Sequence, residues 1–292
     1  MRSENEMMEL ILSKAITDER IRAVILNGSR ANPNVKKDEF QDYDIVYLVN
    51  DIVYLVNDID TFTKDHLWVD YFGERVMMQM PEDKILPAAD NSGHFVYLIQ
   101  FMDGNRIDLT LIPIEKMEKL LKKDSLSILL LDKDGMIGAI PPTSDVDYHI
   151  RKPTEKEYFD TCNEFWWICM NISKGLCREE LSYAMFMHEQ INRNVLIRMI
   201  EWYIGMKTDY SLSAGKLGKY FKNHLTMEEW DEFVLTYSDA NYDNIWTALF
   251  TMCDLFRKIS KKVATHFKFP YQYEDDKRVT NYLKEMRNLQ KR

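Results

Sequence analysis

The sequence lacks the features that would place the protein in a membrane or outside the cell. No apolar run among its 292 residues is long enough to span a bilayer. The first residues, MRSENEMMELIL, mix charged and apolar side chains at helical spacing, which is not the pattern of a secretion signal. The four cysteines, Cys162, Cys169, Cys177 and Cys253, lack C-x-x-C spacing, which favours reduced core thiols over a metal site. We therefore expect a cytoplasmic protein with no membrane partner.

Positive charge and paired histidines are also scarce. The chain has 38 lysines and arginines against 47 aspartates and glutamates, which gives a net charge of −9. Since nucleic-acid phosphates require a basic surface, this balance disfavours a nucleic-acid partner. It is compatible with binding a cation, and it would also serve solubility alone. The six histidines are scattered without metal-ligand spacing, so we assign them no catalytic role.

The periodicity of apolar residues divides the chain into two parts. The first part reads as a mixture of helices and strands, and the second as helices alone. We expect a helix over 4–17, strands over 22–26, 44–49, 75–80, 95–101 and 106–112, and a leucine-rich helix over 120–132. Further along, we expect helices over 157–172, 179–206 (one or two), 227–237 and 244–267. These patterns predict an α+β fold, with a mixed-sheet domain over 1–150 and a helical bundle over 151–292.

Two aspartates, Asp42 and Asp44, are separated by one residue at the start of a predicted strand. Residues i and i+2 of a strand point to the same face, so the two carboxylates can converge on a hard cation such as Mg²⁺. Upstream, Gly28 and Ser29 form a small-residue turn with backbone N–H groups and a hydroxyl suited to phosphate oxygens. Together these features predict nucleotide transfer to a hydroxyl.

Such a reaction needs a third carboxylate near the attacking oxygen, to take its proton or to hold a second metal. Asp108 is the best candidate because it lies within the apolar strand Arg-Ile-Asp-Leu-Thr-Leu-Ile, where an unpaired carboxylate is costly. A half-buried strand with one polar face is the alternative interpretation.

Several other charged residues are candidate ligands. Arg30 could contact the triphosphate or pair with an aspartate, while Lys216 and Lys219 could reach phosphate or belong to a solvated turn. On the predicted helix 157–172, three acids lie three and four residues apart, on one side of the helix. They are Glu157, Asp160 and Glu164. They form either an acidic wall for a polycationic ligand or an ordinary solvated face.

One segment of seven residues is repeated without change. The sequence Asp-Ile-Val-Tyr-Leu-Val-Asn occupies 44–50 and again 51–57. The repeat could form a hairpin, add a strand or loop beside an intact site, or be a tandem duplication that the fold tolerates poorly. Seven is odd, so a continuous strand would reverse which side chains of the second copy face the core. Only the first copy has an aspartate two residues before its own.

These motifs resemble the nucleotidyltransferase superfamily of DNA polymerase β type, and more closely the bacterial aminoglycoside 6-adenylyltransferases (streptomycin 6-adenylyltransferases). The resemblance rests on Gly-Ser-Arg at 28–30, Phe-Gln-Asp-Tyr-Asp-Ile at 40–45 and Ile-Asp-Leu-Thr-Leu-Ile-Pro at 107–113. It continues along nearly the whole chain. Matching stretches include those at 77–83, 130–134, 151–153, 162–166, 174–178 and 255–257.

The resemblance implies transfer of AMP from ATP to a streptomycin hydroxyl, with Mg²⁺ as cofactor and pyrophosphate leaving. Asp42 and Asp44 would hold the metals, and Asp108 would be the third carboxylate and the base. Gly28, Ser29 and Arg30 would grip the triphosphate. The helical domain would close the antibiotic site, since carboxylates pair well with the guanidinium groups of streptomycin.

The chain departs from the family pattern at two positions besides the repeat. Asn27 stands where the family usually has glutamate, and Phe186 lies near the place of a usual aspartate. Two alternatives follow. The protein could modify another small molecule or a protein hydroxyl, or it could be a nucleotide- or drug-binding homologue that the repeat has disabled.

Overall fold

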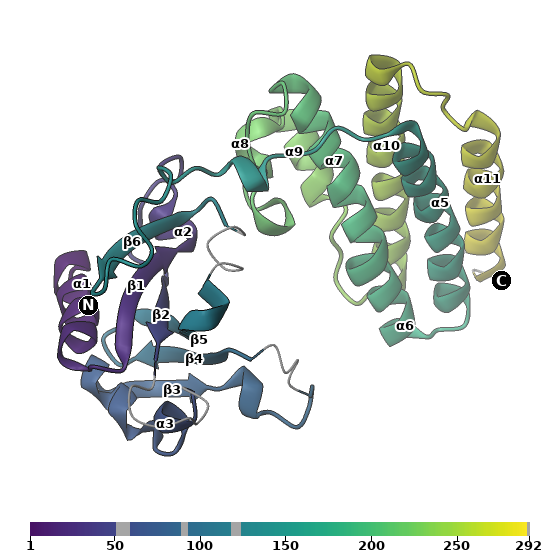
Figure 1. Cartoon of the computed structure of the whole chain (residues 1–292). Coiled ribbons are helices and arrows are strands. Elements are labelled where there is room, and N and C mark those ends of the chain that lie inside the picture. The colour runs from purple at the N-terminus through teal and green to yellow at the C-terminus, as the bar shows by residue number, and fades with distance from the viewer. Residues whose placement is uncertain (51–58, 89–92, 118–123, 291–292) are drawn as a thin grey trace. The chain divides into compact units, whose positions relative to one another are not determined.

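The computed structural model describes residues 1–50, 59–88, 93–117 and 124–290 (Figure 1). The chain divides into two compact units, Met1–Asp147 and Tyr148–Arg292. The first unit contains a six-stranded mixed sheet, and the second contains helices. The expected α+β class is therefore confirmed. Within the described ranges, no helix is long and apolar enough to cross a membrane.

The sheet of the first unit has the strand order β3-β4-β5-β2-β1-β6. Its strands are β1 (Ile21–Asn27), β2 (Tyr43–Val49), β3 (Arg75–Gln79), β4 (Phe95–Phe101), β5 (Arg106–Pro113) and β6 (Ser127–Asp132). The β2–β5 pair is parallel, and the other pairs are antiparallel. Strand β2 is thus held on both sides, and its long apolar run is buried between them.

Helix α1 (Glu4–Thr17) covers part of this sheet. A capping box between Ser3 and Glu6 fixes its start. Its buried side chains, such as Met7 and Ile11, pack in the same core as strand residues, and the Tyr47 hydroxyl donates to the carbonyl of Ile11 at 2.7 Å. The shorter helices of this unit are α2 (Gly28–Ala31), α3 (Asp60–Thr63), η1 (His66–Phe72), η2 (Pro81–Asp83), η3 (Ile114–Lys116) and η4 (Val146–Tyr148), the last of which reaches the first residue of the second unit.

The prediction of a helix over 120–132 is wrong. Ser127–Asp132 forms strand β6, which pairs antiparallel with β1, while residues 118–123 lie outside the described part of the chain. Leucine favours helices only weakly, and here the leucine run completes the sheet beside the buried strand β1. The tertiary pairing outweighs the local preference.

The second unit is built around α5 (Glu155–Cys177) and α10 (Tyr242–Phe267). The expected apolar stripe of α5 is confirmed, since Tyr158, Cys162, Phe165, Cys169 and Ile172 are all buried. The other helices are α6 (Leu181–Phe186), the π-helical turn η5 (Met187–Asn192), α7 (Arg193–Lys207), η6 (Lys216–Gly218), α8 (Phe221–His224), α9 (Met227–Val234) and α11 (Tyr273–Gln290).

The first copy of the repeat forms most of β2, and the amide of Asn50 donates to the carbonyl of Arg20 at 2.9 Å. The second copy, residues 51–57, lies outside the described residues, so the hypotheses about its form stay untested.

Candidate active site

Two of the predicted carboxylates are brought together by the parallel pairing of β2 and β5. Asp44 is the register partner of Asp108, and Asp42 immediately precedes β2. The sequence separation of 64 positions between Asp44 and Asp108 is therefore closed by a single ladder of backbone hydrogen bonds. Their placement depends on regular strands rather than on a loop.

Gly28 connects β1 to α2 against the carboxylate of Asp44. Its φ is +70°, and a Cβ added there would lie only 2.1 Å from Oδ2 of Asp44. A side chain would thus meet both an unfavourable backbone conformation and a direct clash. Glycine is required at this point because the turn approaches the carboxylate so closely.

The site is strongly acidic at its centre. Burial, together with the neighbouring charges of Asp108 and Asp42, raises the pKa of Asp44 to about 6. Burial also raises the pKa of Asp42, although the guanidinium of Arg106 opposes the rise. Among the described residues, none forms a hydrogen bond or ion pair with the Asp44 carboxylate. The site therefore has an excess of negative charge that a cation would relieve.

Arg106 is the residue of this site that the sequence interpretation missed. Its Nε donates to Oδ1 of Asp108 at 2.7 Å and its Nη2 donates to Oδ2 at 2.9 Å. The same Nε lies 3.6 Å from Oδ2 of Asp42. The signal was present in the sequence, since Arg106 and Asp108 are two positions apart on one strand and share a face.

The oxygen donors of this site fit a hard divalent cation in their chemistry. The geometry differs from that of a ready-made metal cage, because both oxygens of Asp108 are held by Arg106. In the part of the chain that the structure describes, no group of three histidine, cysteine or carboxylate side chains is arranged to hold a metal ion. A metal bound by all three aspartates would require Arg106 to move.

Arg30 lies in a different position from the one expected of a triphosphate ligand. It is buried, its guanidinium carbon lies 3.8 Å from the ring centroid of Tyr43, and it donates to the carbonyls of Gln41 and Asp42. These contacts fix the backbone that leads into β2. The structure therefore corrects the expected role, since the guanidinium is occupied by the protein's own carbonyls.

Asn27 and Ser29 flank Gly28 in the turn. The Oδ1 atom of Asn27 accepts a hydrogen bond from the hydroxyl of Ser127 on β6 at 2.9 Å. Ser29 is the second residue of α2, and its carbonyl accepts from the amide of Asn32 at 3.3 Å. A phosphate-binding role for Ser29 stays a prediction.

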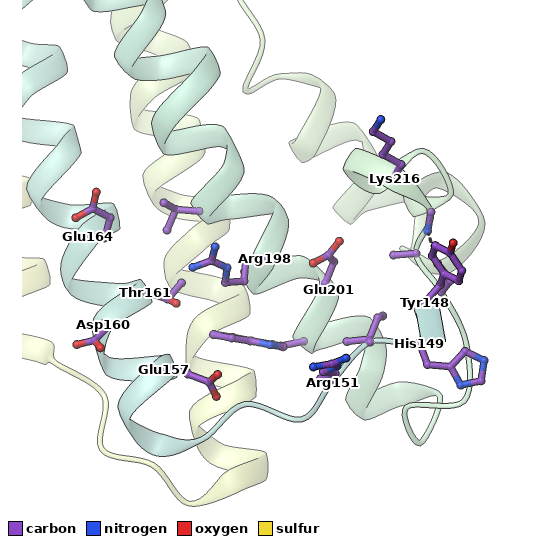
Figure 2. Close-up of a pocket in the computed structure, with 16 residues that line it drawn as sticks. Tyr148, His149, Arg151, Glu157, Asp160, Thr161, Glu164, Arg198, Glu201 and Lys216 are labelled. Carbon is purple, nitrogen blue, oxygen red and sulfur yellow. Dashed lines mark hydrogen bonds between the residues drawn. The ribbon is translucent and has the colours of Figure 1, made fainter. Parts of the chain in front are cut away.

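The second unit contains a pocket of about 870 Å³ between α5, α7 and the segments before and after them (Figure 2). Glu157, Asp160 and Glu164 line it from α5, so the structure brings the three predicted acids to one pocket. Glu201 of α7 adds a fourth acid. Lys216 also lines the pocket, whereas Lys219 is not among the lining residues.

The acids of the pocket are not equally available. Glu157 closes the capping box of α5, and its hydrogen bonds to the amide and hydroxyl of Thr154 lower its pKa. Asp160 pairs with Lys156. Burial raises the pKa of Glu201, against the opposing charge of Arg198. Glu164 is exposed, and no described residue forms a hydrogen bond or ion pair with it.

The pocket also contains cations and an aromatic residue that sequence reasoning did not find. Arg151 and Arg198 line it, together with Trp202. Figure 2 shows Arg198 projecting from α7 into the region between that helix and the acids of α5. Phe186, in contrast, lies at the end of α6 with 55% of its surface exposed and is not a lining residue.

A glycine turn closed over a strand aspartate, with a second aspartate beside it on the neighbouring strand, defines the nucleotidyltransferase class. Residues 1–286 match the family described as streptomycin adenylyltransferase. The chain belongs to this family, and it is an adenylyltransferase enzyme.

Relatives along the full length agree with this assignment. An aminoglycoside 6-adenylyltransferase of Bacillus subtilis (strain 168) is 43% identical, with 97% of each chain covered. One of Campylobacter jejuni is 41% identical over 97% of this chain and 95% of its own. A crystal structure of an aminoglycoside 6-adenyltransferase from Bacillus subtilis is 40% identical, covers 98% of this chain and 99% of that one, and superposes with a TM-score of 0.47.

Proposed function

We propose that the protein transfers AMP from ATP to a hydroxyl of an aminoglycoside, at the 6-position of streptomycin, and thereby inactivates the antibiotic. The observation that carries the proposal is the pairing of Asp44 with Asp108 beside the turn at Gly28. The names of the relatives support the acceptor class. Streptomycin as the acceptor rests on the description of the family.

In the proposed reaction, the acceptor oxygen attacks the α-phosphorus of ATP, an O–P bond forms, and the bond to pyrophosphate breaks. Asp42 and Asp44 would hold Mg²⁺, which when bound would neutralise charge on the phosphate oxygens. A carboxylate oxygen of Asp108 would take the hydroxyl proton. Its position on a paired central strand orients it toward the same site as Asp44.

The turn at Gly28 and Ser29 would supply backbone N–H groups and a hydroxyl to the triphosphate. Arg30 acts one step away, because it holds the carbonyl of Asp42 and thereby positions the carboxylate. Lys216 and Lys219 remain proposed phosphate ligands on the strength of the sequence alone. Lys216 lines the pocket of the second unit, as described above.

We assign the aminoglycoside to the pocket of the second unit. Its acids from α5 and Glu201 suit a polycationic ligand, and a guanidinium can pair with both oxygens of a carboxylate. Glu164 is the best anchor because its carboxylate is exposed and not engaged by a described residue. Arg198 would repel cationic groups of the ligand, so we place these groups on the α5 side.

The mixed charge of the pocket favours one second candidate, a different acceptor. Arg151, Arg198 and Lys216 would accommodate an acceptor that carries negative groups as well. Incubation of the purified protein with radiolabelled ATP and a panel of acceptors separates the two. Label on streptomycin supports the first proposal, whereas label only on a non-aminoglycoside acceptor supports the second.

The decisive experiment is mass spectrometry of streptomycin after incubation with the protein, ATP and Mg²⁺. We expect an added AMP group, which fragmentation would locate at the 6-position. Asp108→Asn should lower the rate by about 10²–10⁴-fold, the usual contribution of a general base. Asp134→Asn, which alters an exposed partner of Arg22, is the matched control. Normal turnover by the Asp108 variant would refute the assigned role.

The repeat provides a separate test of whether the protein is active at all. If the second copy disables the site, the intact chain should bind ATP or streptomycin without turnover, and deletion of residues 51–57 should restore AMP transfer. Turnover by the intact chain would exclude this alternative.

A further inference from the structure

Arg106 is the cation of the nucleotidyl-transfer site, and it occupies the position that a metal would share. Its guanidinium grips both oxygens of Asp108 and approaches Asp42. The hydrogen bond to Asp108, and the charges of Asp108, Asp42 and Asp44, raise the pKa of Arg106. One guanidinium thus interacts with all three carboxylates of the site.

A guanidinium and a divalent cation cannot share Asp108 without cost. The bidentate contact uses both oxygens of the carboxylate, and two positive groups within a few ångströms of each other repel. A metal that engages Asp108 must therefore displace Arg106. Asp44 differs from Asp108 in this respect, because no described residue competes for its oxygens.

Arg106 is free to move. Its side chain is 39% exposed, and its polar contacts in the described part of the chain are those to Asp108 and Asp42. A phosphate offers the same planar fork of acceptor oxygens as a carboxylate, so a nucleotide is a chemically equivalent second partner.

Building on the proposed function, we propose that Arg106 is a resident counterion that occupies Asp108 in the metal-free enzyme and transfers to a phosphate of the nucleotide. Release of Asp108 then allows the metal to bind. Metal and nucleotide therefore bind cooperatively, and metal alone binds weakly. Arg106 is a positioning residue for Asp108 before the reaction and a nucleotide ligand during it.

The test is Mn²⁺ binding to the full-length protein, followed by electron paramagnetic resonance with and without a non-hydrolysable ATP analogue. For the wild type, we expect the analogue to tighten Mn²⁺ binding at least about tenfold. Arg106→Ala should bind Mn²⁺ alone about tenfold more tightly than the wild type, because removing a charge-assisted pair frees Asp108. The same variant should lose most of the cooperativity with the nucleotide.

Two further variants complete the design. Arg75→Ala, which removes an ion pair with Asp70 at β3, should bind Mn²⁺ as the wild type does. Arg106→Lys keeps the charge but loses the fork, so it should bind Mn²⁺ alone with intermediate affinity. If the alanine variant does not fold, as judged by circular dichroism, the lysine variant decides the question by the same criterion.

The outcomes separate this inference from the proposed function. Asp44→Asn should abolish Mn²⁺ binding, and if it does not, the assignment of the metal site itself is wrong. If Asp44→Asn abolishes binding but the Arg106 variants bind Mn²⁺ alone no more tightly than the wild type, only the role of Arg106 is overturned. Undiminished cooperativity in those variants would overturn it as well.

Discussion

Replacing Asp44 by asparagine should stabilise the metal-free protein, although it removes a proposed metal ligand. Burial and the charges of Asp108 and Asp42 raise the pKa of Asp44 from 3.8 to about 6. The folded state therefore holds a proton on Asp44 more tightly than the unfolded state does. This contribution to stability is complete below about pH 4 and is lost as the pH rises through 6.

The size of the effect follows from the pKa. A difference of about two pKa units corresponds to about 3 kcal/mol, which solvent screening at this partly exposed site reduces to about 1–3 kcal/mol. Asp44→Asn removes the charge and should recover this amount above pH 6. For a protein of this size, a gain of 1 kcal/mol raises the melting temperature by roughly 2–4 °C.

The assay is thermal unfolding in the presence of a chelator, recorded between about pH 4 and pH 8. We expect the variant to melt several degrees above the wild type at high pH and to lose the advantage near pH 4. Asp18→Asn is a control of opposite sign. Burial opposes ionisation of Asp18, but Arg20 and Lys14 hold its pKa at about 2, so its loss should destabilise the protein near pH 7. An Asp44 variant that is destabilised, or stabilised equally at every pH, would refute the reasoning.

Three further predictions concern the turn, the pocket and the helical core. Gly28→Ala would force Asp44 to move, so we expect the rate of AMP transfer to fall at least about 10²-fold; an alanine variant with normal turnover would contradict the close approach. Glu201→Gln should raise the KM for streptomycin several-fold with little change in kcat, whereas Glu180→Gln, which lies outside the pocket, should leave both unchanged in steady-state assays. Glu229→Gln should lower the free energy of unfolding by about 1–3 kcal/mol at pH 7, measured by urea denaturation, because two charge-assisted or hydroxyl hydrogen bonds hold its buried carboxylate. Since these partners outweigh burial and lower the pKa of Glu229 to about 2, that loss should vanish as the pH falls toward 2; a constant difference would argue against it.

The sequence predicted the sheet wherever alternation or apolar runs were strong, and it failed where pairing decided the outcome. The segment 44–49 reads as a strand by composition alone and is one. The leucines before Asp132 suit either a helix or a strand, and only the neighbouring β1 selects the strand. No local pattern contains that information, because the partner lies about a hundred residues earlier.

The carboxylates of the site were recognisable because spacing and chemistry coincide in Asp42, Asp44 and Asp108. The roles of the arginines were not recognisable. Arg30 reads as a phosphate ligand, yet its guanidinium bonds to carbonyls, and Arg106 attracted no attention although it touches Asp108. Long side chains reach several partners, so their contacts depend on the tertiary structure rather than on position in the sequence.

The central place of β2 in the sheet has a consequence for motion. Asp44 belongs to a strand that is hydrogen-bonded on both sides, and Asp108 belongs to its neighbour. Backbone amides of such strands open last and exchange with deuterium most slowly. The scaffold that carries these two carboxylates is therefore among the most rigid parts of the first unit. The adaptability that substrate entry requires must then come from side chains such as Arg106, whose rotation leaves the sheet undisturbed.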